Sequence, residues 1–314
     1  MRTGLVMDAS CDLPQAFVNQ HHITVLPIHV DVDGEEFDDH RDEGEIQRFI
    51  DEQSGVRHHA AATEPCSAEA IQNLFLGDLV ARFDCVFCLT VSASRSPTHA
   101  NATQASFSIL KNYRSVRELA GQQGPFLLRV VDTQSLFAGS AVVVAEAVRL
   151  IAEGQGPAQI RERLTDISHD TYGYLLPRDL HQLRAQARKK GDHSVGLIGA
   201  TLGSALDIKP ILRGWRGETQ AVAKMRGFDA GAEALFRHTA ERIRAGLRTP
   251  FVAMSYGGPL VEMRALPGYA QVPEACTECG LQLLESPMSI TGMASVGEGA
   301  LAVGFASSEY TPTF

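Results

Sequence analysis

Residues 86–100 read Val-Phe-Cys-Leu-Thr-Val-Ser-Ala-Ser-Arg-Ser-Pro-Thr-His-Ala and predict a strand, a polar turn and the start of a helix. The first six residues are almost continuously apolar, which is typical of a strand covered on both faces of a parallel sheet. Ser96 and Pro97 are residue types that favour the first turn of a helix. The turn between them and the strand should lie at the carboxyl end of a central strand, where open α/β sheets bind ligands.

Hydroxyl side chains crowd this turn, and they are candidate ligands for an anion. They are Ser92, Ser94, Ser96 and Thr98. The helix that follows would add outward-pointing N–H groups and a dipole that favours negative charge. The same hydroxyls could instead cap the helix and satisfy the turn, and the residues alone leave both interpretations open.

The composition describes an ordinary globular protein. The chain has 314 residues, of which 44% are hydrophobic and 21% charged, and its net charge is −9. Its length suggests about two domains, and the negative charge argues against nucleic-acid binding, which needs a basic face. No apolar run approaches the roughly 20 residues of a membrane helix. The first seven residues lead straight into a strand with no signal-peptide pattern, so we expect a cytoplasmic protein.

The order of elements predicts an α/β fold. Apolar strands at 3–7, 86–91 and 126–131 alternate with helical segments in the first half, which is the pattern of a mostly parallel sheet flanked by helices. We expect residues 23–30 to form another strand, with Pro27 at an edge or bulge. A second α/β domain should follow, which divides the chain into residues 1–168 and 169–314.

Six cysteines include two pairs at Cys-x-x-Cys spacing. Cys85 and Cys88 lie within a predicted strand, where residues three apart point to opposite faces and cannot share a metal ion. Cys276 and Cys279 are predicted in a polar loop, where they could be redox-active or bind a metal.

Several segments, in the same order along the chain, resemble the DegV family of bacterial lipid-binding proteins. Residues 6–14 resemble the family's opening strand with its acidic-serine loop, and residues 23–28 resemble its second strand. Residues 62–66 stand where the family has Thr-Ser-Gln-Pro-Ser, and residues 91–98 stand where it has Ser-Ser followed by Leu-Ser-Gly-Thr-Tyr. Residues 131–133 resemble its Asp-Ser turn, and residues 202–212 with 225–227 are the most specific part of the resemblance. The resemblance implies a two-domain α/β protein with a long-chain fatty acid buried between the domains.

The resemblance also implies how the ligand is used. Family members present the acid to a separate fatty acid kinase, which makes an acyl phosphate for phospholipid synthesis, so the binding protein itself does no chemistry and needs no cofactor.

The resemblance further suggests which residues contact the ligand. Thr63 and Ser92 are the foremost candidates for the head group, with Ser94, Ser96 and Thr98 beside them. Ser295 stands where the family has a head-group histidine, and Arg226 could contact a partner or be a surface charge. The family's Gly-Gly-Arg segment is not recognisable around 189–196.

Two other functions remain open. A hydrolase or transferase could use a serine of the Ser92–Ser96 turn as nucleophile, with His99 as the nearby base, although no Gly-x-Ser-x-Gly motif is present. A thiol or metal protein could use Cys276 and Cys279.

Overall fold

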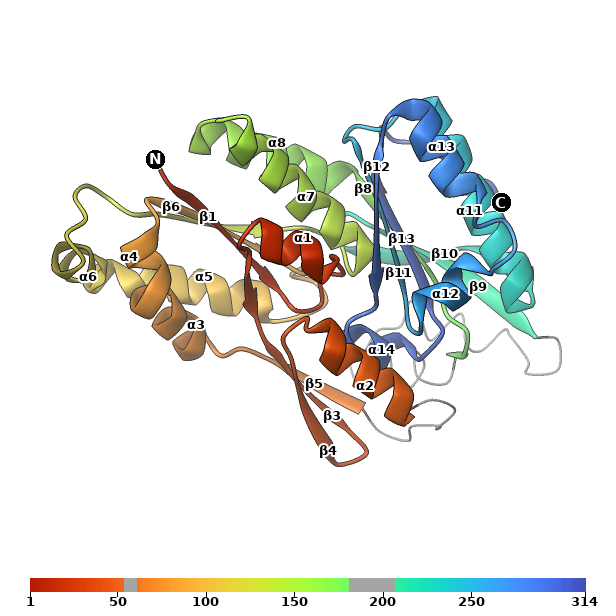
Figure 1. The fold of residues 1–314 in the computed structure, drawn as a ribbon, viewed down its shortest axis with the longest axis horizontal. Coiled ribbons are helices and arrows are strands. Elements are labelled where there is room, and N and C mark those ends of the chain that lie inside the picture. Colours follow the sequence, from red (N-terminus) through yellow and green to blue (C-terminus); the bar gives the residue numbers. More distant parts are fainter. Residues whose placement is uncertain (54–60, 181–206) are drawn as a thin grey trace.

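Two large β-sheets face each other across a buried helix in the computed structural model of the chain (Figure 1). The structure describes residues 1–53, 61–180 and 207–314. One sheet is entirely parallel and flanked by helices, and the other belongs to a second sheet-rich unit. The predicted fold class is therefore confirmed.

The parallel sheet contains the strand that was predicted from residues 86–91. Its four strands run in the order β2-β1-β6-β7. Their bounds are β1 (Thr3–Asp8), β2 (Thr24–Leu26), β6 (Cys85–Thr90) and β7 (Leu127–Asp132). Every residue of β6 is buried, because helices cover both faces of the sheet. The carboxyl ends of β1, β6 and β7 consequently lie together at one edge.

The two faces of β6 belong to different hydrophobic clusters. Val86 and Cys88 pack with the helices on one face, whereas Cys85 and Phe87 pack in the cluster that contains the central helix α7. The outer-face helices are α3 (Ala68–Leu74), η1 (Phe75–Leu79), α4 (Val80–Arg82), α5 (Thr98–Ser108), η2 (Ile109–Lys111) and α6 (Tyr113–Leu119). Cys85 and Cys88 thus point to opposite faces, as the strand period predicts.

Helix α7 (Ala138–Ala152) is the wall that the two sheets share. It is rich in alanine and valine and nearly all buried, and it contacts β1 on one side and β8, β11 and β13 on the other. At Gly304 a Cβ atom would lie 2.3 Å from the carbonyl oxygen of Ala138, so the close approach requires glycine. Helices α1 (Gln15–Gln20) and α8 (Pro157–Asp170) pack into the same cluster.

The second large sheet has the order β10-β9-β8-β13-β11-β12 and is antiparallel except between β11 and β12. Its strands are β8 (Thr171–Leu176), β9 (Ile208–Trp215), β10 (Glu218–Arg226), β11 (Phe251–Tyr256), β12 (Gln282–Pro287) and β13 (Leu301–Ala306). Helices α11 (Phe228–Ala245), α12 (Leu260–Arg264) and α13 (Gln271–Cys279) lie on its side away from α7 (Figure 1). The parallel sheet ends at Asp132 and this sheet begins at Thr171, while the boundary at 168/169 stays a prediction.

The single strand predicted over residues 23–30 is wrong. The chain leaves the parallel sheet after β2 and enters a small antiparallel sheet with the order β4-β3-β5, and Pro27 stands at the change. Proline has no N–H to donate to a ladder, so a break between two strands is a natural place for it. The small sheet comprises β3 (Ile28–Val32), β4 (Glu35–Asp39) and β5 (Ala61–Pro65). Helix α2 (Glu43–Gln53) follows β4 in the chain, and α14 (Ile290–Val296) packs against β3 and β5.

The loop predicted at Cys276 and Cys279 is also wrong. Both residues belong to α13, which ends at Gly280 in a left-handed conformation. The segment 189–196, compared with Gly-Gly-Arg, and the first part of the segment 202–212 fall outside the described residues. Within the part that the structure describes, no helix has the length and apolar character needed to cross a bilayer.

Candidate functional site

Three loops meet at the carboxyl edge of the parallel sheet, and hydrogen bonds hold them together. The Asp8 carboxylate after β1 accepts from the Val91 N–H at 2.5 Å, and Asp132 after β7 accepts from the Ala93 N–H at 3.2 Å. The Ser92 N–H donates to the carbonyl of Ser135 at 3.0 Å. Neighbouring strands thus fix the Ser92 turn from both sides.

The hydroxyl of Ser92 begins a chain of hydrogen bonds that reaches the second sheet. Its Oγ lies 3.0 Å from Ser94 Oγ, and Ser94 donates at 2.5 Å to the carbonyl of Gly217. Because the single Ser94 proton is committed to Gly217, Ser92 must be the donor in the first bond. The Gly217 N–H donates in turn to the carbonyl of Gln134 at 3.0 Å, so the β9–β10 turn closes over the serine turn.

A small cavity lies under this contact, between the serine turn, the start of α7 and the second sheet. Its volume is about 50 Å³. The lining contains the polar residues Ser92, Arg95, Gln134 and Ser135, and the walls include apolar side chains and glycines. These wall residues are Leu136, Phe137, Gly173, Leu175, Leu212, Gly214, Gly217 and Ala302, with Tyr174, Glu218 and Thr219 completing the lining. The cavity is large enough for a few waters or a carboxylate group.

Ser96 and Thr98 use their hydroxyls locally. Their oxygens lie 2.8 Å apart, and the Thr98 N–H points to Ser96 Oγ at 3.3 Å. Neither residue lines the cavity beside Ser92. These contacts lie within the turn itself, and α5 has no side-chain cap at its first residue.

The structure places the other predicted site residues elsewhere. Thr63 lies half-buried in β5, opposite Val30 of β3. Ser295 lies on α14, which packs against β5, and the Ser295 hydroxyl donates to the Thr291 carbonyl at 2.8 Å. Arg226 is exposed at the end of β10, roughly 20 Å along the strand from the cavity residue Thr219. Of the predicted set, only Ser92 lines the cavity, and Ser94 bonds to it.

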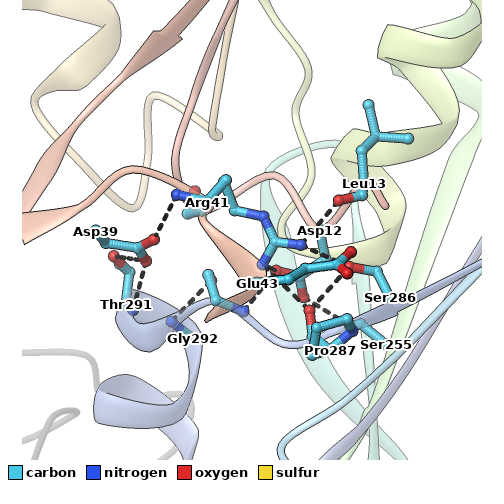
Figure 2. A network of polar contacts seen from close by, with 12 residues as sticks. Asp12, Leu13, Asp39, Arg41, Glu43, Ser255, Ser286, Pro287, Thr291 and Gly292 are labelled. Carbon is cyan, nitrogen blue, oxygen red and sulfur yellow. Dashed lines mark hydrogen bonds and ion pairs between the residues drawn. The ribbon is translucent and has the colours of Figure 1, made fainter. Parts of the chain in front are cut away.

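A buried ion pair joins the first half of the chain to the second (Figure 2). The Arg41 guanidinium lies 3.5 Å from the Asp12 carboxylate, and both side chains are almost wholly buried. Arg41 also donates to Ser286 Oγ at 2.5 Å and to the Pro287 carbonyl at 3.1 Å. Asp12 accepts from Ser255 Oγ at 2.6 Å, which gives it a contact with the second sheet.

The same network holds α14. The backbone of Arg41 has φ +63°, a left-handed conformation that is uncommon for a side chain of this size. Its N–H donates to Asp39, whose other oxygen accepts both the N–H and the hydroxyl of Thr291 at 2.8 Å. The helix that carries Ser295 is therefore fixed by two residues of the first half.

Burial dominates the electrostatics of the acidic residues in these loops. It raises the pKa of Asp8, although three hydrogen bonds to its carboxylate act against the shift. Burial likewise raises the pKa of Asp12, opposed first by the nearby charge of Arg41. The carboxylate oxygens of Asp8 and Asp12 already accept hydrogen bonds from neighbouring loops, so we assign both residues a structural role.

The serine nucleophile hypothesis lacks its base. His99 Nδ1 lies 3.0 Å from Thr90 Oγ1, and the ring faces a separate groove between β7 and α8. Among the described residues, no histidine lies within hydrogen-bond distance of Ser92, whose hydroxyl is paired with Ser94. A serine attack that depends on a neighbouring base is therefore not supported.

The cysteines do not form a metal site in the described ranges. No group of three or more His, Cys, Asp or Glu side chains there could hold a metal ion. Burial raises the pKa of the Cys276 thiol to about 11, which leaves it mostly protonated at neutral pH, and Cys279 is exposed. A buried thiol of this kind is a poor nucleophile.

Arg95, Gln134 and Ser135 also line the cavity, although they were not among the predicted site residues. The signal was available, because the polar turn after residue 131 follows a strand that neighbours the Ser92 strand. Carboxyl ends of parallel strands meet at one edge. The closing turn at Gly217 had no such signal, since its partner turn is over a hundred residues away.

Comparisons with known proteins agree on one family. A sequence profile described as "Uncharacterised protein, DegV family" matches residues 2–308. A DegV domain-containing protein of Xanthomonas axonopodis pv. citri is 54% identical over 98% of both chains.

Solved structures show the same fold at low identity. DegV of Bacillus subtilis, described as a fatty acid binding protein, superposes with a TM-score of 0.75 at 19% identity, covering 98% of this chain and 100% of that one. A stearic acid-binding protein from Eubacterium ventriosum gives a TM-score of 0.73 at 18% identity, covering 97% and 98%.

Proposed function

Because this chain belongs to the DegV family, we propose that it is a non-catalytic protein that binds a long-chain fatty acid. The observation that supports this most is the cavity beside Ser92, whose lining combines polar residues with the apolar side chains of Leu136, Phe137 and Leu212. A ligand with an acidic head and an apolar tail matches that combination. Relatives of the same fold are described as fatty-acid-binding proteins.

The tail would supply most of the affinity. A chain of 16 to 18 carbons offers on the order of 14–16 methylenes, each stabilised by roughly 0.8 kcal/mol on burial. The gross gain of about 12 kcal/mol can exceed the costs of association and ordering. The head group then needs only a few well-placed donors to fix its position.

Entry of the tail would require the walls to separate. The cavity of about 50 Å³ is well below the 300–1,000 Å³ of sites for drug-sized ligands. The β9–β10 turn is bonded through Gly217 to Ser94 of the serine turn and to Gln134 of the turn after β7. In the proposal the head group occupies the cavity, and the tail parts the apolar walls between α7 and the second sheet.

Native mass spectrometry of the purified protein tests the proposal. We expect a co-purified mass that matches a fatty acid of about 16–18 carbons, lost after organic extraction and regained on adding stearic acid. Protein that leaves a lipid-replete host without lipid, and takes up none afterwards, would refute the proposal.

We propose further that the bound acid is presented to a separate fatty acid kinase. There the carboxylate oxygen would attack the terminal phosphorus of ATP, forming an acyl phosphate and releasing ADP, so no bond would form to this chain. Arg226 is exposed and far from the cavity, which suits a contact with a partner. In an assay that traps acyl phosphate with hydroxylamine, Arg226→Glu should slow product formation without changing the affinity for stearate. A rate equal to that of the unaltered protein would remove Arg226 from the kinase contact.

A further inference from the structure

Strand β7 is an edge of the parallel sheet. It pairs with β6 along its whole length, from Leu127 opposite Cys85 to Asp132 opposite Thr90. In the described part of the chain, no strand lies on its other side. A free edge presents backbone N–H and C=O groups in a row and is a template for pairing with a further strand.

Alternate residues of β7 direct their backbone groups to this free edge. The N–H groups of Leu127 and Thr133 donate to carbonyls in or next to β6, so the odd-numbered residues face that strand. The even-numbered residues Leu128, Val130 and Asp132 therefore direct their N–H and C=O groups away from the sheet. Those of Val130 bond to nothing within residues 1–53, 61–180 and 207–314.

A groove runs along the same edge and leaves it open to another chain. Its volume is about 1150 Å³. Every residue of β7 except Leu128 lines it, together with His99 at the start of α5 and with the amino-terminal part of α8. Helix α8 thus lies beside the edge without filling the space next to it.

The other edge strands carry features that hinder such pairing, and β7 does not. Strand β2 has three residues and stops before Pro27, while β12 and β5 end in Pro287 and Pro65. The pairing of β10 is irregular between Ala221 and Ala223, and β4 is acidic at every position but one. Prolines, irregularities, short length and charge are the means by which proteins protect sheet edges. Strand β7 reads Leu-Leu-Arg-Val-Val-Asp and pairs with β6 in an unbroken register.

The charges that line the groove are of both signs and lack partners. Arg129 and Arg161 are the cations, and Glu162 and Asp166 are anions; none of the four forms an ion pair in the described ranges. Asp132 also lines the groove, but its carboxylate already accepts from two backbone N–H groups. An interface between two copies related by a twofold axis must be complementary to itself, which requires both signs on each copy.

We propose that β7 pairs in antiparallel fashion with β7 of a second copy of this chain, which joins the two parallel sheets into one. With the twofold axis at Val130, the Val130 residues of the two copies face each other, and Leu128 of each pairs with Asp132 of the other. The outward backbone groups would then be satisfied. The charged walls of the two grooves would meet, so that cations of one copy lie against anions of the other. The inference does not depend on fatty-acid binding.

Sedimentation velocity of the purified full-length protein tests the proposal. The concentration should span about 1–100 µM, the range over which a dimer of micromolar affinity dissociates. We expect the mass of two chains at the upper end and of one chain at the lower end. The mass of one chain at every concentration would overturn the proposal and leave the edge to an extended segment of another protein.

Proline at the centre of the edge separates this pairing from other modes of association. Val130→Pro removes an N–H that only the second copy would use and keeps the bonds to β6, so the variant should fold and associate at least about tenfold more weakly. Val130→Thr is the matched control, because it keeps the N–H and the branched side chain, and it should dimerise like the unaltered protein. Equal dimerisation of the folded Val130→Pro protein would overturn the proposed interface.

Charge reversal keeps the test decisive should Val130→Pro fold poorly. One variant carries Arg129→Glu with Arg161→Glu, and the other carries Glu162→Lys with Asp166→Lys. Each alone places like charges against each other and should be monomeric, whereas an equimolar mixture should form a dimer of one copy of each. A mixture that stays monomeric, or a dimer of either variant alone, would refute the assigned contact. Arg48→Glu, on the exposed face of α2, should leave dimerisation unchanged.

Discussion

At the scale of single residues, Ser92 matters because it connects two sheets. Its hydroxyl reaches Gly217 through Ser94, and its N–H binds the neighbouring turn at Ser135. A ligand that engages Ser92 would therefore act on the contact that closes the cavity. Ser96 resembles Ser92 in sequence but bonds only within its own turn and to Thr98.

Replacement of Ser92 by alanine tests that difference. Ser92→Ala should weaken stearate binding by roughly 1–3 kcal/mol, because a buried acceptor or donor of the head group would lose its partner. Isothermal titration calorimetry on extracted protein measures the change. Ser96→Ala is the matched control and should bind stearate as before. Equal affinities for all three proteins would remove Ser92 from the site.

His238 predicts a pH dependence of stability. The ring is buried in α11, with Nδ1 3.0 Å from the Thr313 carbonyl and Nε2 3.1 Å from the Tyr310 hydroxyl. Burial lowers the pKa of His238 to about 4. The unfolded chain takes up a proton below pH 6.5 while the folded chain stays neutral, so the free energy of unfolding should fall by up to about 3 kcal/mol between pH 6.5 and 4.

Urea unfolding at several pH values measures this effect. His238→Gln removes the titrating group, so its unfolding free energy should fall less steeply than that of the unaltered protein over the same window. Identical slopes for the two proteins would show that His238 is not held neutral. The carboxylates titrate in both proteins and cancel in the comparison.

At the scale of elements, the β9–β10 turn is the part of the second sheet that touches the serine turn. Gly217 has φ +76°, and a Cβ atom there would lie 3.2 Å from Ser92 Oγ. Gly34, in the turn between β3 and β4, has φ +90° with nothing within 4 Å of the added atom. The two glycines therefore share a backbone preference but differ in surroundings.

Alanine at each glycine separates strain from contact. Gly217→Ala and Gly34→Ala should each lose about 1–2 kcal/mol of stability, because alanine is disfavoured at positive φ. Only Gly217→Ala should also weaken stearate binding, since its methyl group presses on Ser92. Thermal unfolding and calorimetry measure the two effects. An equal loss of affinity in both variants would contradict the assigned contact.

The elements themselves were predictable to the extent that local pattern determines them. The apolar run at 86–91 predicted a central buried strand correctly, since a strand covered on both faces must be apolar throughout. Pro27 was misplaced because the chain changes sheets there, and an apolar run on both sides hides the break. Cys276 and Cys279 were assigned to a loop because prolines, glycine and charges surround them, yet packing of α13 on α11 overrides that local preference.

At the scale of the whole molecule, the Asp12–Arg41 pair is the clearest link between the halves of the chain. Arg41 bonds to Ser286 and Pro287, and Asp12 bonds to Ser255 (Figure 2). Asp12 also accepts from the N–H of Ser289. Removing one partner leaves the other charge buried without its counter-charge. Such a loss typically costs 3–5 kcal/mol, far more than loss of a surface pair.

A double-mutant cycle measures the link. Arg41→Met should lower the free energy of unfolding by about 3–5 kcal/mol. Asp12→Asn combined with Arg41→Met should lose less than the sum of the two single changes, because no unpaired charge remains. Guanidinium unfolding monitored by circular dichroism gives the values. Additive losses would mean that the two residues do not interact in solution.

The site was less predictable than the fold because its contacts join distant parts of the chain. Ser92 followed from its place after a central strand, which a local pattern can identify. Arg41 gave no signal directly after an acidic hairpin, since its partners Ser286 and Pro287 lie more than 200 residues away. Ser135 was predictable in principle from the neighbouring strand, but its unpaired hydroxyl depends on Gly139 and Gly173, which only the packing brings together.

The most direct test is the crystal structure of the protein loaded with stearic acid. The account predicts the carboxylate in the cavity between the sheets, within hydrogen-bond distance of Ser92, with the tail between α7 and the second sheet. A carboxylate bound elsewhere, for example in the groove between β7 and α8, would contradict the account.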